Sequence, residues 1–541
     1  MAFFLVGFLV GFIAVLGYQL RNVGRRPLDY PPGPPTLPLI GNLHLMPKEK
    51  AYLQFQKWAN EYGPVYSLIL GTKVMIVLSS DQAIKDLLDK RSGVYSSRPD
   101  MYLGNIVSGG LRMLLMEYGE TWRMIRKIVH NNLNIKAART YVPYQDLENK
   151  AMLVGFLEQP NLFVDHIRRY TNSLTTQMVF GFRTTSIDDP KLKQLFHGFE
   201  KFSEVLAAQT SALLDLFPVL RALPDFALPL RRYAKMLHQK ESELYVGHWL
   251  NVKKEIKNGT ARPCFCLDLA RAQDEEGFSD PLAGYVSGSL LEAGSDTTAA
   301  TLVGFVQAML LFPEVAKAAQ EELDRVCGER LPGLDDEPSL PYIRGCVKEC
   351  MRWMPTNILG VPHAVIRDDE YMGYRIPKGA GVMWNVWAIH MDPNRHPDPR
   401  RFDPTRYAND NQTAAEAANN PIASERDHFL FGAGRRLCQG MHIAERSLFL
   451  AIARLLWAFD FRLAQDAHGH DIEPNADDLT EGVFVMPKPF LASIVSRDEQ
   501  KVACVRAEWT KMEELLDANL QWKVLPEGLI WKEYKHAAAA S

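Results

Sequence analysis

Cys438 and the glycine-rich loop around it constrain the fold of this 541-residue chain more than any other feature. Residues 431–440 have the sequence Phe-Gly-Ala-Gly-Arg-Arg-Leu-Cys-Gln-Gly, and a helical pattern follows over residues 442–450. Glycines let backbone N–H groups approach the sulfur, and the positive end of a following helix favours a thiolate. Arg436 lies where it can meet a carboxylate such as a haem propionate. The loop therefore predicts a haem whose iron is held by Cys438. A structural cysteine in a helix-capping loop is the alternative.

The composition favours one large catalytic domain. The chain is 47% apolar and 23% charged, and no linker-like segment divides it after residue 50. A formal net charge of -3 and the lack of a lysine- and arginine-rich block argue against a nucleic-acid partner. Seven scattered cysteines form no disulfide framework, which favours a reducing compartment.

The N-terminus predicts a membrane anchor. Residues 3–20 are uncharged and largely apolar, and Arg21, Arg25 and Arg26 follow. The length fits a bilayer crossing, and the arginines put its C-terminal side in the cytosol. A cleaved signal peptide is the alternative, but no basic segment precedes the run and no small-residue cleavage site ends it. We expect an anchor over residues 1–20 and a basic, proline-rich hinge over residues 21–48.

Apolar periodicity predicts a mainly α domain with small β-sheets, of the α+β class, over residues 49–496. Residues 92–118 and 391–428 are expected to be irregular, and the extension 497–541 has no assigned role beyond one expected helix at 508–520. Short strands are expected at 65–70, 74–78, within 361–385 and near 496. The expected helices span residues 49–62, 81–90, 119–132, 140–157, 161–181, 190–210, 229–257, 282–312, 313–327, 339–354 and 440–458.

The long apolar helix at 282–312 contains a polar interruption, Ala-Gly-Ser-Asp-Thr-Thr, at residues 293–298. Three adjacent poor helix formers weaken the hydrogen-bond ladder there, and Gly294 leaves room beside the helix. An acid followed by an alcohol can relay protons to dioxygen during cleavage of the O–O bond. We expect an oxygen-binding notch with Asp296 and Thr297 as the relay. A polar segment facing solvent is the alternative, which the apolar neighbours disfavour.

Two helical charge patterns add to this constellation. Glu349 and Arg352 stand at i,i+3, a weak pattern by itself, because Glu322 and Arg325 have the same spacing. Trp122 and Arg126 place an indole N–H and a guanidinium on one helix face, a pattern that by itself favours a chance surface pair over a functional one.

In order and spacing, these motifs resemble those of the cytochrome P-450 family across residues 31–496. The resemblance implies a haem-thiolate monooxygenase that inserts one oxygen atom of O2 into a hydrophobic substrate, with haem b (iron protoporphyrin IX) and Cys438 as the axial metal ligand. It also implies that Glu349 and Arg352 form a buried ion network with Arg406. The cofactor contacts that it implies are Cys438, Arg436, Arg126, Trp122, His363, Phe431, Gly432, Gly440, Ala293, Gly294 and Arg98.

The electrons must come from another protein, because the chain has no dinucleotide or flavin motif. The resemblance implies an NADPH–cytochrome reductase that carries the NADPH and flavins, with cytochrome b5 as a second candidate donor. Basic residues 123, 127, 136 and 139 could meet an acidic reductase, although a plain solvated face is an equal alternative. The resemblance further implies a single-pass protein of the endoplasmic reticulum membrane whose catalytic domain faces the cytosol.

Residues 441–449 resemble ascomycete family members of secondary metabolism. We therefore expect hydroxylation of a small phenolic or other aromatic polyketide. Oxidation of a fatty acid, terpenoid or xenobiotic stays open, as do a haem-thiolate isomerase or dehydratase and a non-catalytic haem or ligand carrier. The intact Asp296–Thr297 pair argues against the isomerase. An apolar pocket is expected from Tyr102, Met113, Leu114, Met116, Leu290, Ala293, Ile358, Val361, Val483 and Phe484.

Overall fold

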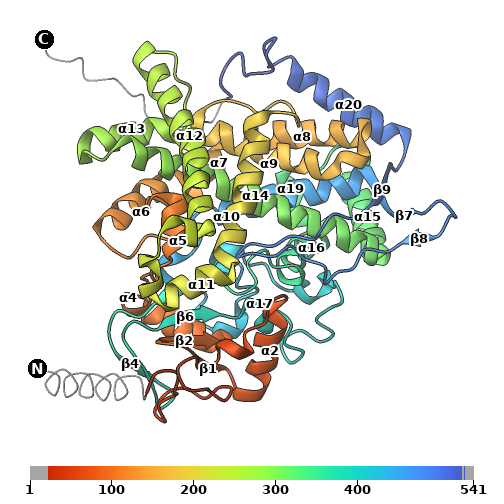
Figure 1. Cartoon of the computed structure of the whole chain (residues 1–541). Helices are drawn as coiled ribbons and strands as arrows, with labels where there is room; N and C mark the ends of the chain where they lie inside the picture. Colours follow the sequence, from red (N-terminus) through yellow and green to blue (C-terminus); the bar gives the residue numbers. More distant parts are fainter. Residues whose placement is uncertain (1–21, 527–528, 530–541) are drawn as a thin grey trace, which may run out of the picture.

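Helices form most of the chain in the computed structural model, which describes residues 22–526 and residue 529 (Figure 1). The expected anchor at residues 1–20 lies outside the described residues. Within the described part, no single helix is both long and apolar enough to cross a bilayer. Helices α14 (Asp280–Leu311) and α15 (Pro313–Cys327) pass that test only as a pair, which bends by 104° at their junction.

A small sheet lies below the helices in the view of Figure 1. Strands β1 (Val65–Leu70) and β2 (Lys73–Leu78) form an antiparallel hairpin, as the sequence predicts, and α2 (Ala51–Tyr62) packs beside it. The hairpin turns at Gly71, whose φ of +60° is a conformation that favours glycine. Further along the chain, β6 (Gly381–Trp384) pairs in parallel with β2, and β3 (His363–Ala364) completes the sheet. The sheet thereby joins the first hundred residues to the segment after residue 360.

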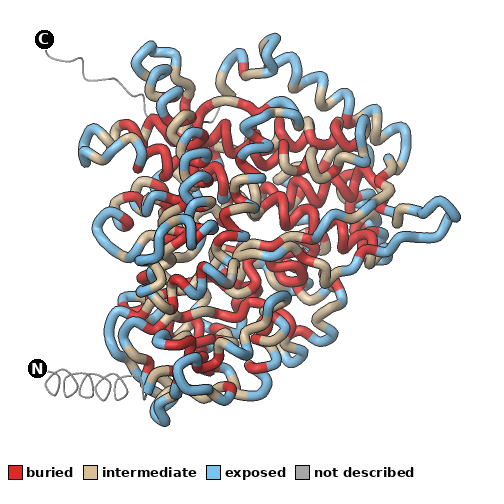
Figure 2. Tube along the Cα trace, in the orientation of Figure 1, coloured by how far each residue is buried: buried red, intermediate tan, exposed pale blue. Residues whose placement is uncertain are grey.

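Helix α14 (Asp280–Leu311) runs through the centre of the helical region, where α9 (Phe163–Phe180) and α12 (Pro229–Asn258) pack against it. Small residues allow this close packing. A Cβ added to Gly288 would lie 2.1 Å from the ring of Tyr245 on α12. Helices α16 (Pro341–Trp353) and α19 (Met441–Ala458) contribute to the same core, and Figure 2 shows these central helices as largely buried. The core therefore holds α14 in a fixed position.

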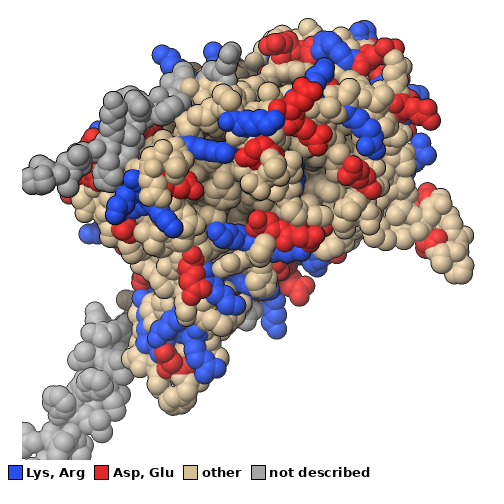
Figure 3. All heavy atoms as spheres, turned by 90° about the horizontal axis from the view of Figure 1, so that it is seen from above, with Lys and Arg blue, Asp and Glu red and all other residues tan. Residues whose placement is uncertain are grey.

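The remaining elements are short or lie at the periphery. Charged side chains of both signs are interspersed over the face in Figure 3. The other strands are β4 (Asp369–Tyr371) paired with β5 (Tyr374–Ile376), and β7 (Phe459–Gln465) paired with β8 (Asp471–Ile472) and β9 (Ala492–Ser496). The other α-helices are α3 (Asp81–Ile84), α4 (Ser92–Tyr95), α5 (Tyr102–Ser108), α6 (Glu120–Leu133), α7 (Ile135–Thr140), α8 (Val142–Glu158), α10 (Pro190–Ala207), α11 (Gln209–Leu216), α13 (Phe265–Glu276), α15 (Pro313–Cys327), α17 (Val386–His390), α18 (Ala414–Asn419) and α20 (Glu499–Glu513).

Several expected elements differ from those observed. Segment 92–118 is only partly irregular, because α4 and α5 form within it. The helix expected at 140–157 forms as α8, and the one expected at 190–210 ends at Ala207 as α10, with α11 directly after it. Helices α7, α13, α17 and α18 were not expected. In the C-terminal extension the helix expected at 508–520 is wrongly placed. Helix α20 starts earlier, at a cap where the Asp498 carboxylate accepts a 2.7 Å hydrogen bond from the Lys501 N–H, and Leu516 instead pairs with Trp522.

Candidate active site

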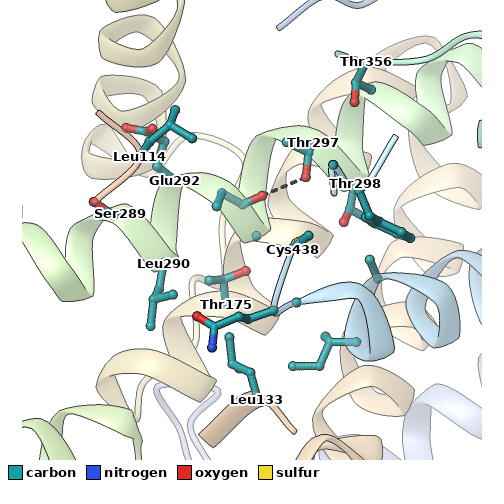
Figure 4. A pocket seen from close by; sticks show the side chains of 18 of the residues that line it. Leu114, Leu133, Thr175, Ser289, Leu290, Glu292, Thr297, Thr298, Thr356 and Cys438 are labelled. Carbon is teal, nitrogen blue, oxygen red and sulfur yellow. Dashed lines mark hydrogen bonds between the residues drawn. The ribbon is translucent and has the colours of Figure 1, made fainter. Parts of the chain in front are cut away.

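A cavity of about 310 Å³ lies between α14 and the loop that carries Cys438. Figure 4 shows Thr297 and Thr298 on α14 and Cys438 on the loop that leads into α19, around the same space. Segments from several parts of the chain complete the wall, among them the region between α5 and α6 and residues 356–361. Residues that are far apart in the sequence therefore meet at one enclosed site.

The loop before α19 positions Cys438 through its backbone. Gly434 has a φ of +59°, and a Cβ there would lie 2.0 Å from the carbonyl oxygen of Leu88, so only glycine fits. The Cys438 N–H donates a 2.8 Å hydrogen bond to the carbonyl of Phe431 and closes the loop. Protein surrounds the Cys438 thiol, and its accessible surface faces the cavity.

The surroundings of Cys438 act on its pKa in two directions. Burial raises the pKa of the thiol, whereas the N–H groups of Gly440 and Met441 and the guanidinium of Arg126 lower it. The net shift is upward, so the thiol keeps its proton until a metal takes the proton's place. In the described residues no cluster of three His, Cys, Asp or Glu side chains could hold a metal ion. A metal at Cys438 would therefore need its other ligands from a cofactor.

Three arginines, Arg98, Arg126 and Arg436, line the cavity without a carboxylate partner among residues 22–526. Arg98 donates to the carbonyls of Val361 and Pro362, at 2.5 and 2.8 Å. Burial lowers the pKa of Arg126 to about 10 and that of Arg436 to about 9. Burial, and then Arg436, also lower the pKa of Arg98 well below its usual value. Three buried cations with only neutral partners fit an anionic ligand.

His363 and Trp122 support this cationic wall without lining the cavity. His363 on β3 is 1% exposed, and neither ring nitrogen has a hydrogen-bond partner in the described structure. Burial and the two nearby guanidinium groups lower the pKa of His363, so its imidazole is neutral. Trp122 on α6 is buried, with the Arg436 guanidinium 4.2 Å from its ring centre.

These groups fit a haem. Cys438 would ligate the iron, and Arg98, Arg126 and Arg436 would face its propionates, whereas His363, which was expected to contact the cofactor, lies behind this wall. Phe431, Gly432 and Gly440 from the loop line the same space, as do Ala293 and Gly294 from α14.

Only part of the polar interruption in α14 lines the cavity. Thr297 lines the cavity, and its hydroxyl donates a 2.8 Å hydrogen bond to the carbonyl of Ala293. Asp296 does not line the cavity. Burial raises its pKa to about 7, the cation Arg168 opposes that rise, and Glu292 and Glu200 add to it. The Asp296 carboxyl is therefore near half-protonated at neutral pH and can both give and take a proton.

Gly294 has an additional role that the sequence did not indicate. A Cβ at this position would lie 2.7 Å from the hydroxyl oxygen of Thr175 on α9. The glycine therefore lets α9 approach α14, besides contributing to the cavity wall.

Glu349, Arg352 and Arg406 meet in the structure. Arg406 Nε lies 3.3 Å from Glu349 Oε1, and Arg352 forms two hydrogen bonds to the same carboxylate. Glu322 and Arg325, which have the same spacing in the sequence, form only a loose surface pair: Arg325 is 71% exposed, and its guanidinium lies 3.9 Å from the Glu322 carboxylate.

The expected substrate pocket is only partly assembled. Met113, Leu114, Leu290, Ala293, Val361 and Phe484 line the cavity, whereas Tyr102, Met116, Ile358 and Val483 do not. Tyr102 instead contacts Arg231 and Arg221, because α5 directs it away from the cavity. Ile358 is buried in the main core.

Sequence reasoning missed Arg112, Ser289 and Glu292, which also line the cavity. An acidic residue inside an apolar helix was a signal for Glu292, but nothing local pointed to Arg112.

The comparisons with known proteins agree with this site. The family model for Cytochrome P450 matches residues 31–493. The chain is similar to the cytochrome P450 monooxygenase virE of Hypocrea virens, with 59% identity over 98% of this chain and 97% of the relative. It is also similar to the cytochrome P450 monooxygenases fogE of Aspergillus ruber, at 56% identity, and fsoB of Humicola fuscoatra, at 52%; each of these alignments covers 98% of both chains.

Proposed function

The chain belongs to the cytochrome P450 family and is a monooxygenase, and from that premise we propose that it hydroxylates a small phenolic or other aromatic polyketide in fungal secondary metabolism. The observation that carries this proposal is the enclosed cavity between Cys438 and Thr297. Its fungal relatives and its apolar wall, which includes Leu290 and Phe484, support an apolar substrate of modest size.

Each side chain of the site has a part in this activity. When bound, the haem supplies the iron that activates O2. Cys438 holds the iron, and the three cavity-lining arginines hold the propionates. Thr297 delivers a proton into the cavity from its hydroxyl, and Asp296, the next residue back on α14, resupplies it. The apolar side chains position the substrate and exclude water.

The network of Glu349, Arg352 and Arg406 has a structural part. It ties α16 to the irregular segment that precedes the Cys438 loop. Its loss would leave a buried charge without a partner.

Electrons reach the site from a partner protein, which we propose is an NADPH–cytochrome reductase, with cytochrome b5 as a second donor. Arg123 and Lys127 on α6 and Lys136 and Arg139 on α7 are exposed and suit an acidic partner. We further propose that residues 1–20 anchor the chain in the endoplasmic reticulum membrane, with the catalytic domain in the cytosol.

The test is product analysis with microsomes that carry the full chain and a fungal reductase. Aromatic polyketides, fatty acids and terpenoids are supplied separately with NADPH and O2. We expect a product one oxygen atom heavier from a phenolic polyketide. Turnover of fatty acids or terpenoids alone would contradict the substrate class. A rearranged product formed without reductase would instead indicate an isomerase.

A further inference from the structure

Four polar side chains form a buried cluster beside the cavity, here called the polar cluster: Arg112, Glu241, Tyr245 and Glu292. Arg112 lies between α5 and α6 and is 1% exposed, Glu241 and Tyr245 lie on α12, and Glu292 lies on α14. The guanidinium of Arg112 donates to both carboxylates, and the Tyr245 hydroxyl donates a 2.5 Å hydrogen bond to Glu292. Arg112 and Glu292 line the cavity, so the polar cluster forms part of its wall.

The polar cluster has one unpaired donor, Arg112 Nε, and one unpaired acceptor. It sets one guanidinium against two carboxylates, and burial raises the pKa of Glu241 to about 7, with Glu292 adding to the rise and Arg112 opposing it. Burial also raises the pKa of Tyr245 well above its usual value, so this hydroxyl stays neutral. Glu241 Oε2 is buried without a hydrogen-bond partner. Whether Glu241 is protonated or ionised, the single guanidinium leaves the polar cluster without a net positive charge, so the cluster favours a neutral ligand that donates a hydrogen bond over a carboxylate ligand.

A second unpaired group lies one turn earlier on α14. Ser289 lines the cavity, and its hydroxyl has no partner in the described structure. Because buried polar atoms are usually paired, an unpaired hydroxyl on a residue of the cavity wall is free to bond to a ligand. If the cluster served only to tie α12 to α14, Ser289 would have no reason to be polar.

We propose that Glu292, held in place by Arg112 and assisted by Ser289, accepts a hydrogen bond from a hydroxyl group of the substrate. This inference rests on the proposed hydroxylase function and specifies the substrate as a neutral phenol or alcohol rather than a carboxylic acid. Thr297 lies five residues after Glu292, about 7.5 Å along the helix axis. A hydroxyl held at Glu292 therefore leaves the rest of a substituted phenol to extend toward the Thr297 end of the cavity.

Binding titrations of the haem-loaded full chain test the proposal. The probes are 4-heptylphenol, its methyl ether and 4-heptylbenzoate, and the measured quantity is the dissociation constant from the substrate-induced spin-state shift. We expect the phenol to bind about tenfold more tightly than the ether, the value of one hydrogen bond to a charged group. The benzoate should bind more weakly than both.

The variants Glu292→Gln and Ser289→Ala should each reduce the phenol-to-ether ratio, the first to near one. Ser287→Ala is the matched control. It is the same change on the same helix, at a buried hydroxyl that donates 2.9 Å to the carbonyl of Ala283 and does not line the cavity. If Glu292→Gln fails to take up haem, the phenol-to-ether ratio of Ser289→Ala tests the proposal by itself. This variant should fold, because the Ser289 hydroxyl makes no hydrogen bond that the substitution would remove.

Equal binding of phenol and ether to the unaltered protein would overturn the proposal, as would tighter binding of the benzoate. So would an unchanged ratio in Ser289→Ala and in any haem-loaded Glu292→Gln. Failure of the proposed function looks different: the unaltered protein would then lack a thiolate-type carbon monoxide spectrum, or would make no hydroxylated phenolic product.

Discussion

The carboxylate of Glu349 and the guanidinium of Arg352 form two hydrogen bonds of 2.6 Å where neither side chain is exposed. The same carboxylate accepts a 2.9 Å hydrogen bond from the N–H of Asp403, and Arg352 donates 2.9 Å to the carbonyl of His390. The pair therefore joins α16 to two segments that come later in the chain, so that breaking it disturbs more than one helix.

Replacing Arg352 with Ala should destabilise the protein by about 3–5 kcal/mol, because the buried Glu349 carboxylate would lose two charged hydrogen bonds and keep only the longer contact with Arg406. The measurement is the urea concentration at which the haem absorbance is lost. Arg325→Ala is the control, since Arg325 is 71% exposed and should change stability by less than about 0.5 kcal/mol. Equal losses of stability in Arg352→Ala and Arg325→Ala would show that the buried pair contributes no more to stability than an exposed one.

Replacing Cys438 with Ser should abolish the thiolate-type Soret shift under carbon monoxide, because no other cysteine is expected to reach the iron. Cys504→Ser, at a half-buried position on α20, is the control and should leave the spectrum intact. A thiolate spectrum that survives in Cys438→Ser would disprove the ligand assignment.

Replacing Thr297 with Ala should uncouple electron use from product formation. Without the hydroxyl that now donates to Ala293, protons reach reduced oxygen less productively. The ratio of hydrogen peroxide released to hydroxylated product should rise several-fold, and Thr297→Ser should restore it. Unchanged coupling in Thr297→Ala would mean that the threonine only supports the helix.

The pKa of Asp296, raised to about 7, predicts a dependence of stability on pH. A carboxyl whose pKa is higher in the folded than in the unfolded protein binds more protons when folded. Its favourable contribution is complete below about pH 4 and is lost as the pH rises through about 7. Asp296→Asn removes this ionisation. The midpoint of thermal unfolding of the variant, measured relative to that of the unaltered protein, should therefore rise as the pH increases from 5 to 8. Parallel curves over this range would contradict the raised pKa.

The Cys438 loop and the hairpin were predictable because their geometry is local. The positive φ at Gly434 favours glycine, and β1 and β2 form antiparallel pairs on either side of the turn at Gly71. The Ser80 hydroxyl caps α3 by accepting a hydrogen bond from the Ala83 N–H. The spacing of Glu349 and Arg352 likewise depends only on the pitch of one helix. Signals of this kind arise within a few residues, so the sequence alone determined these elements and the family to which they point.

Other features depend on contacts between distant segments. Helix α5 within segment 92–118 packs on α12, Asp296 is not part of the cavity wall that Thr297 lines, and Gly294 makes room for Thr175. Arg112 meets Glu292 across 180 residues of chain. No periodicity encodes such a meeting, because burial and pairing depend on which helices pack together. Tertiary structure alone therefore decided which polar groups enter the cavity, whereas the sequence by itself determined the loop that holds Cys438.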